Sequence, residues 1–141
     1  MKQGINFLTI GVTDLERMKN FYKNCFGWSP VKETEDIVFF KLNGFILALF
    51  PSEELAKDIG ITQDGHGFKR FALAINCHSE KEVDQVFEHL RAAGVDIIKD
   101  PARVFWGGYS GYIADVENNY WEIAYNPFLE LDQQGNVLSH S

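Results

Sequence analysis

Thr13-Asp-Leu-Glu-Arg-Met-Lys-Asn-Phe-Tyr-Lys-Asn-Cys-Phe-Gly27 is the stretch of sequence that decides the fold. It begins with a capping box, in which the Thr13 hydroxyl accepts from the backbone N–H of Glu16 and the Glu16 carboxylate reaches back. Gly27 can end a helix in the left-handed conformation. Apolar residues recur between these two signals at helical spacing, at Leu15, Met18, Phe21, Tyr22 and Cys25. The stretch therefore predicts an amphipathic helix.

The same set of signals occurs a second time in the chain. Ser79-Glu-Lys-Glu82 is another capping box, and Gly94 supplies the stop. The apolar stripe between them consists of Val83, Val86, Phe87 and Leu90. Cap, stripe, length and stop all repeat after 66 or 67 positions, which indicates an internal duplication.

Extended segments surround each predicted helix in the same order, one before it and three after it. Asn43-Gly44 predicts a hairpin between the last two strands of the first half, and Asp115 to Asn119 predicts the matching turn of the second half. The predicted strands are Ile5–Val12, Ser29–Glu33, Ile37–Leu42 and Phe45–Phe50, then Phe68–Asn76, Val95–Lys99, Gly108–Ala114 and Tyr120–Tyr125.

The predicted fold is α+β, with two βαβββ modules that form a curved mixed sheet around a cavity. We expect one domain over residues 1–141, with modules at about 4–51 and 67–127. The linker 52–66 is predicted to hold a short helix around Ser52–Asp58, and the tail 128–141 has no assigned structure. Strand alternation turns Phe7, Ala48, Arg70 and Glu122 toward the cavity.

Composition limits the kinds of partner. Hydrophobic residues make up 45% of the chain, which suits a globular domain, and the net charge of −7 argues against nucleic acid. No apolar stretch approaches the roughly 20 residues that span a membrane, and the N-terminus lacks a leader pattern. We expect a cytoplasmic protein with no membrane partner, in which Cys25 and Cys77 are buried reduced thiols.

Several motifs together resemble the vicinal oxygen chelate superfamily of glyoxalases, bleomycin-resistance proteins and extradiol dioxygenases. The similarity covers about Ile5 to Pro127 and includes the first helix with Phe26-Gly27-Trp28 and the corner Ala93-Gly94-Val95. The closing motif runs from Gly111-Tyr-Ile-Ala-Asp115 to Trp121-Glu122-Ile123. The resemblance implies a small-molecule pocket, lyase, isomerase or dioxygenase activities, and frequent homodimers.

The resemblance also gives the places of the family's metal ligands, two in each module. They fall on Phe7, Ala48, Arg70 and Glu122, of which only Glu122 can bind a cation. We therefore predict a glyoxalase-like member without the usual metal site and without a cofactor. The departures from the family's Asp-Pro-Asp-Gly-Asn turn, such as Val116, leave the turn geometry intact.

Arg70 and Glu122 have two interpretations. They form an internal ion pair that only compensates two buried charges, or they act on a ligand. In the second case Arg70 anchors an anionic or carbonyl-bearing ligand, and Glu122 orients it or acts as a base. These two residues are the tentative catalytic candidates.

Aromatic residues are the other candidates for ligand contact. Trp106 and Tyr109 lie in a loop with glycines at 107, 108 and 111, where they can stack on a flat or apolar ligand. The full predicted ligand-binding set is Phe7, Ala48, Phe50, Arg70, Trp106, Tyr109, Tyr112 and Glu122. His66, in the loop before the fifth strand, is interpreted as an exposed histidine first and a ligand second.

Three functions remain open from the sequence. The first is a metal-independent protein that binds a small molecule, similar to bleomycin-resistance proteins. The second is a glyoxalase-like enzyme that uses Arg70 and Glu122 or an unrecognised metal site. The third is a protein that mainly mediates the assembly of subunits and whose cavity is vestigial. The sequence does not decide whether the protein is an enzyme.

Overall fold

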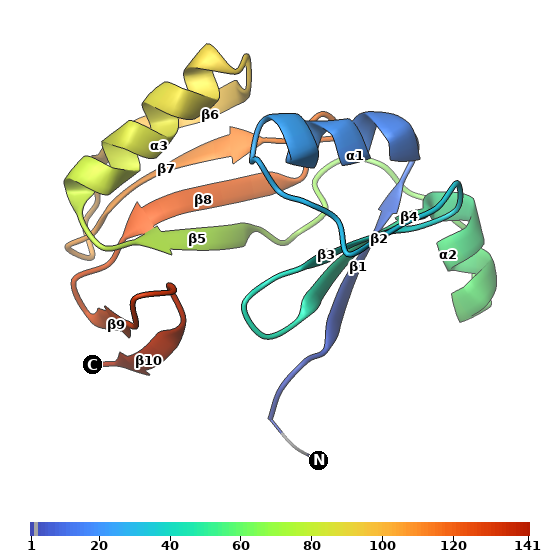
Figure 1. Cartoon of the computed structure of the whole chain (residues 1–141), viewed down its shortest axis with the longest axis horizontal. Helices are drawn as coiled ribbons and strands as arrows, with labels where there is room; N and C mark the ends of the chain where they lie inside the picture. Colours follow the sequence, from blue (N-terminus) through green and yellow to red (C-terminus); the bar gives the residue numbers. More distant parts are fainter. Residues whose placement is uncertain (2) are drawn as a thin grey trace. The chain divides into compact units, whose positions relative to one another are not determined.

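The computed structural model describes Met1 and residues 3–141, which divide into two compact units, 1–68 and 69–141. Each unit contains a helix and a four-stranded mixed sheet in the order β-α-β-β-β (Figure 1). The predicted α+β class with two such modules is confirmed. None of the helices in the described residues is long and apolar enough to cross a membrane.

The sheet of the first unit has the strand order β1-β4-β3-β2. The outer strand β1 runs parallel to β4, while the other neighbours are antiparallel. The helix α2 follows β4 directly, as predicted for the linker. The elements are β1 (Phe7–Val12), α1 (Leu15–Asn24), β2 (Lys32–Glu33), β3 (Val38–Lys41), β4 (Ile46–Pro51) and α2 (Ser52–Ile59).

An aromatic core holds α1 against this sheet. Tyr22 is fully buried and stacks on Trp28 with ring centroids 5.7 Å apart. Its ring also meets Phe26 edge-on at 5.1 Å and lies 5.9 Å from the buried Phe40 of β3. Aromatic pairs in these arrangements add to the free energy of burial.

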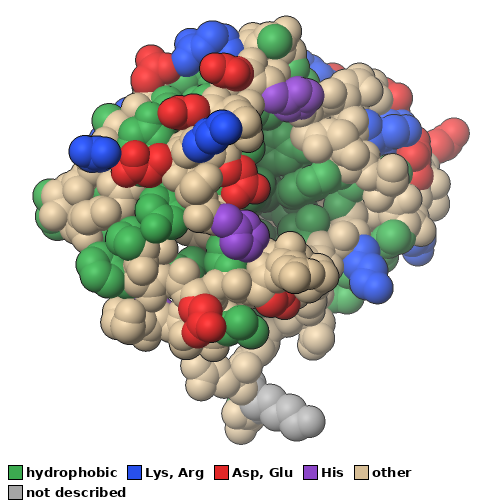
Figure 2. Space-filling model, turned by 60° about the vertical axis from the view of Figure 1, so that its left-hand side comes forward, with side chains coloured by type: hydrophobic (Ala, Val, Ile, Leu, Met, Phe, Trp, Pro, Cys, Tyr) green, Lys and Arg blue, Asp and Glu red, His purple; other side chains and the backbone are tan. Residues whose placement is uncertain are grey.

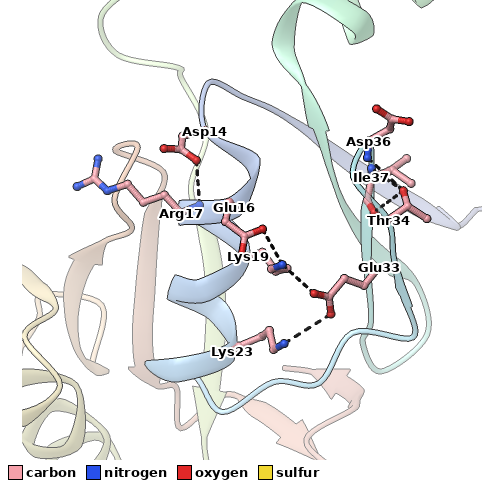
Figure 3. A network of polar contacts seen from close by, with 9 residues as sticks. All are labelled: Asp14, Glu16, Arg17, Lys19, Lys23, Glu33, Thr34, Asp36 and Ile37. Atoms are coloured by element: carbon pink, nitrogen blue, oxygen red, sulfur yellow. Dashed lines mark hydrogen bonds and ion pairs between the residues drawn. The ribbon is translucent and has the colours of Figure 1, made fainter.

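A polar network on the surface connects α1 with β2 (Figure 3). Lys19 binds Glu33 and its helix neighbour Glu16, each at 2.7 Å, and Lys23 reaches Glu33 at 3.5 Å. The two lysines lower the pKa of Glu33, and the two carboxylates raise the pKa of Lys19, mainly through hydrogen bonds. The short strand β2 is thereby fixed to the helix.

The sheet of the second unit has the strand order β5-β8-β7-β6, with β5 parallel to β8. The helix α3 packs on one face of this sheet, and a two-stranded hairpin of β9 and β10 follows it in the chain. The elements are β5 (Leu73–Cys77), α3 (Glu80–Ala92), β6 (Asp96–Arg103), β7 (Tyr109–Ala114), β8 (Tyr120–Tyr125), β9 (Leu129–Leu131) and β10 (Val137–His140).

The two helix caps differ in one respect from the prediction. Ser79 caps α3 as expected, with its hydroxyl accepting from Glu82 N at 3.1 Å. The cap of α1 is Asp14, whose carboxylate accepts from Arg17 N at 3.0 Å, so the predicted Thr13 capping box is wrong by one residue. Aspartate is as good an N-cap residue as threonine or better, because its negative charge is also stabilised by the positive end of the helix dipole.

The C-terminal tail, which had no predicted structure, forms the β9–β10 hairpin by repeating the turn between β7 and β8. In the first turn Asp115 accepts from Asn119 N at 2.9 Å and from Asn119 Nδ2 at 2.7 Å. In the second turn Asp132 accepts from the same two atoms of Asn136, at 2.9 and 2.8 Å. The pattern Asp-x-x-[Asn/Gly]-Asn was therefore a signal for a second hairpin.

Some strands are shorter than predicted. The segment before α3 becomes a strand only at Leu73 instead of Phe68, and the segment after α1 pairs only at Lys32 and Glu33. The predicted β-structure at 68–72 is wrong, because Arg70 has a positive φ of 64°, which is incompatible with a strand.

Large hydrophobic side chains also reach the surface among acidic ones (Figure 2). Four of them belong to the connection between the two units, where every residue from 59 to 72 is exposed. They are Ile59, Ile61, Phe68 and Phe71. Apolar side chains concentrated on one segment are typical of a surface that another chain covers.

Candidate functional site

The first unit presents an apolar sheet face on the side opposite α1. Phe7 and Ala48 share that face, because strand alternation turns Ile10 and Leu49 toward the core. Phe7 is 50% exposed, and its ring meets Phe39 edge-on with centroids 5.4 Å apart. Ala48 is buried and adds no bulk, so the exposed surface of this face is mainly aromatic.

The helix α2 covers the end of this face at which Phe50 lies. Gly11 is the strand partner of Phe50, and a Cβ on Gly11 would come within 2.8 Å of the Ser52 hydroxyl and 3.3 Å of Leu55. Only glycine permits so close an approach of the helix. Phe50 is consequently half-buried, whereas Phe7 remains accessible to a ligand.

Glu122 occupies the centre of the second unit's sheet. It lies on β8 between Ala74 of β5 and Tyr112 of β7, all three on the face that α3 leaves uncovered. Burial first, and then the negative charge of Glu122, raise the pKa of the Tyr112 hydroxyl. A neutral phenol beside a carboxylate supplies one donor and several acceptor positions to a polar ligand.

Trp106 lies in the β6–β7 hairpin, and its ring packs directly on Gly108. A Cβ on Gly108 would overlap the Trp106 ring and lie 2.8 Å from the carbonyl oxygen of Tyr125, so a larger residue requires the ring to move. By alternation Gly108 precedes Ser110 and Tyr112 on the sheet face that carries Glu122. The structure thus brings Trp106, Tyr112 and Glu122 to the same face.

Tyr109 does not join this group. It is the first residue of β7, not part of a flexible loop as predicted, and alternation turns its side chain toward α3. Its hydroxyl donates a hydrogen bond of 2.6 Å to Asp84 of that helix. This bond, with a smaller contribution from burial, raises the pKa of Tyr109 to about 12. The structure therefore separates Tyr109 from Tyr112 and Glu122.

Arg70 lies three residues before β5 and is exposed. Within the described part of the chain no ion pair joins Arg70 to Glu122, so the predicted internal ion pair is not formed. The reason is the late start of β5, since Ala74, and not Arg70, is the β5 partner of Glu122.

Lys69 is a residue of this region whose role the sequence did not reveal. Its ammonium donates to the carbonyl oxygen of Glu117 at 3.1 Å and to Asn119 Oδ1 at 2.8 Å. The only sequence signal was the adjacent pair of basic residues, Lys69 and Arg70, which says nothing about a distant turn. His66 lies in an exposed loop, as expected.

Two further side-chain groups bear on the chemistry of the chain. Among the described residues, no cluster of three or more His, Cys, Asp or Glu side chains is arranged to hold a metal ion. Both cysteines are thiols, and burial raises the pKa of Cys77 to about 11, which keeps it protonated and unreactive at neutral pH.

Paired β-α-β-β-β modules with open sheet faces define a class of two-module α+β proteins. Residues 4–123 match the model of the Glyoxalase/Bleomycin resistance protein/Dioxygenase superfamily, and the chain belongs to this family. The resemblance seen in the sequence is therefore confirmed at the level of the superfamily.

Individual proteins show the same relationship. The metallothiol transferase FosB of Lysinibacillus sphaericus is 30% identical over 120 residues, which cover 85% of this chain and 80% of that protein. The crystal structure of a glyoxalase-related enzyme from Fulvimarina pelagi is 35% identical, with a TM-score of 0.87 over 99% of this chain and 100% of that chain.

A more distant structure shares the fold alone. The fosfomycin resistance protein FosX of Listeria monocytogenes is 24% identical, with a TM-score of 0.69 over 89% of this chain and 95% of that chain.

Proposed function

We propose that the protein binds a small molecule without a metal ion, through residues on the open sheet faces of its units. The observation that carries the proposal is Glu122, a carboxylate between Ala74 and Tyr112 on a face to which Trp106 adds an aromatic surface. Ligand sites typically combine apolar walls with a few polar groups in this way. Phe7, Ala48 and Phe50 are the proposed ligand contacts on the sheet face of the first unit.

The residue types at the family's metal positions support metal independence. A catalytic divalent cation generally needs three or more protein ligands and an open position. Phe7 and Ala48 cannot donate, and the Arg70 guanidinium repels a cation, which leaves Glu122 alone. This donor set does not fit the metal of the family's enzymes.

In this proposal Glu122 orients the ligand through its carboxylate, and Arg70 holds an anionic or carbonyl group of it. Tyr112 donates a hydrogen bond, since its raised pKa keeps the hydroxyl protonated at neutral pH. The cytosol is the proposed compartment, because both cysteines are thiols.

A glyoxalase-like enzyme is the second candidate. The 30% identity to a protein named metallothiol transferase favours it, because that name describes a group transfer that depends on a metal. Such an activity here would use Glu122 and Arg70 as catalytic residues, or a metal bound through ligands outside the family's usual positions.

Elemental analysis of protein purified from medium supplemented with zinc and manganese separates the two candidates. Our proposal predicts less than about 0.1 equivalent of either metal, since a single carboxylate binds such ions weakly. One equivalent of a transition metal that survives dialysis, and is lost in E122Q, would favour the metal enzyme instead.

A thermal-shift screen of metabolites and aromatic antibiotics then tests binding itself, because a ligand that binds only the folded chain raises its melting temperature. E122Q and Y112F should lose the shift, whereas E88Q, at an exposed position on α3, should retain it. A hit that binds E122Q and Y112F as well as the parent protein would place the ligand elsewhere.

We also propose that the chain forms a homodimer, supported by the exposed hydrophobic side chains of the 59–72 connection. Light scattering coupled to size-exclusion chromatography should give twice the chain mass of 16.1 kDa. F68E/F71E should return it to the mass of the monomer, whereas T62E/Q63E, in the same connection, should not.

A further inference from the structure

Arg70 has an unusual backbone conformation for its residue type. Its φ is 64°, and Asn118 is the only other non-glycine residue with a positive φ in the described chain. Asparagine tolerates this conformation because its short side chain bonds locally, whereas arginine is strained there. In the connection before Arg70, the other residues with a positive φ are glycines, with φ of 127° at Gly65 and 93° at Gly67.

Ordered parts of the structure lie on both sides of Arg70 in the chain. On one side, the Lys69 ammonium is bound to Glu117 O and Asn119 Oδ1, and Asn119 in turn donates to Asp115 Oδ2 at 2.7 Å. Asp115 and Asn119 are buried, so the turn that receives Lys69 is rigid. On the other side, β5 begins at Leu73.

The Arg70 guanidinium has no protein anion to compensate it. No carboxylate lies within ion-pair distance in the described residues, although the chain contains 20 Asp and Glu residues. The neighbouring Lys69 is occupied by the turn. An arginine that is strained, fixed from both sides and without a counterion is typical of a functional position, because glycine would relieve the strain.

We infer that Arg70 binds an oxyanion group of the ligand, a carboxylate or a phosphate, and that Lys69 is the residue that positions it. The planar fork of the guanidinium matches two oxygens of either group. This inference rests on the proposed function, because it assigns a chemical class to the molecule that the protein binds.

The experiment measures the melting temperature of the full chain against inorganic phosphate and, separately, acetate, with chloride at the same ionic strength as the reference. The parent protein should be stabilised by one of the two anions, and the better anion identifies the group. R70G should abolish this response while its melting temperature without anion equals or exceeds that of the parent, because glycine relieves the strain.

The role of Lys69 is tested with a conservative pair. K69M should raise the apparent Kd for the anion about tenfold, and binding should still saturate. A tenfold change corresponds to the free energy of about one hydrogen bond to a charged group. K69R, which can still donate to the turn, should restore most of the affinity. Any anion response that remains in R70G should be the same in K69M/R70G, because a positioning residue acts only through Arg70.

Three results would overturn the inference. They are an unchanged anion response in R70G, a lower stability of R70G than of the parent, and an equal loss of response in R17M, an exposed arginine on α1 that serves as the charge control. If neither anion stabilises the parent protein while a neutral compound from the metabolite screen does, this inference fails, whereas small-molecule binding at Glu122 and Tyr112 stands.

Discussion

The Tyr109 hydroxyl, at the start of β7, donates a hydrogen bond of 2.6 Å to the Asp84 carboxylate of α3. Because side chains alternate along a strand, Tyr112 is turned to the opposite face, where Glu122 lies. The register of β7 between β6 and β8 thus assigns Tyr109 to a structural contact and leaves Tyr112 to the face that is open to a ligand.

Removal of the Tyr109 hydroxyl should have an effect that depends on pH. The folded-state pKa of about 12 lies above the ordinary value of 10.0, so the bond contributes its full stability below pH 10 and loses it between pH 10 and 12. Y109F should cost about 0.5–1 kcal/mol at pH 8, since the pair is accessible to solvent. Urea unfolding at pH 8 and pH 12 checks this, and a difference that persists at pH 12 would contradict it.

Two glycines should tolerate alanine to different degrees. In G111A the new Cβ would lie 2.5 Å from Lys99 O and 2.6 Å from Phe87 Cζ, and the backbone oxygen cannot move easily. In G108A the new Cβ would meet the ring of Trp106, a side chain that can shift, and one backbone atom, the Tyr125 carbonyl oxygen at 2.8 Å. We expect a loss of about 2–3 kcal/mol for G111A and less for G108A. Chemical denaturation measures both, and G4A, at a position without near neighbours, should be neutral.

The two related turns should differ in their importance. Asp115 is buried, so D115A leaves the buried Asn119 amide without its acceptor and should cost about 2–3 kcal/mol of global stability. D132A affects an accessible turn and should release only the β9–β10 hairpin. Hydrogen exchange should show loss of protection confined to 129–140 in D132A. Equal global destabilisation by the two substitutions would contradict the difference in burial.

The turn at Asp132 should also respond to acid. Hydrogen bonds from Asn136 lower the pKa of Asp132 below its usual 3.8, so its contribution is complete above that pH and is lost as the pH falls through the folded-state pKa. The amide protons of the hairpin should lose protection in this acidic range before the sheet unfolds. D132N should show the same reduced protection at every pH.

The Glu33 network should stabilise the first unit only while Glu33 is ionised. Its pKa is lowered from 4.5 by Lys19 and Lys23, so the contribution is present above that pH and disappears as the pH falls through the lowered value. E33Q should therefore lower the melting temperature slightly at pH 7 and not at pH 3. E35Q, two residues further along the chain and exposed, is the matched control and should behave as the parent at pH 7.

The amino-acid sequence by itself determined the duplicated module. Caps, apolar stripes, left-handed glycines and turn residues act within a few positions of one another, so Ser79, Gly27 and Gly94 behave as predicted. These local signals were sufficient for the fold class and the family. The Asp132 turn was equally readable, because it repeats the chemistry of the Asp115 turn.

Only the tertiary structure decided where the candidate site residues lie. The Lys69 ammonium binds Asn119, in a turn 50 positions away. Next to it, Arg70 has a left-handed backbone conformation, which no local sequence pattern at Arg70 indicates. Tyr109 faces α3 because of the register of β7 in the sheet, and there it meets Asp84 of that helix. Contacts between residues distant in the sequence fix such orientations, since each depends on two segments whose meeting neither segment encodes alone.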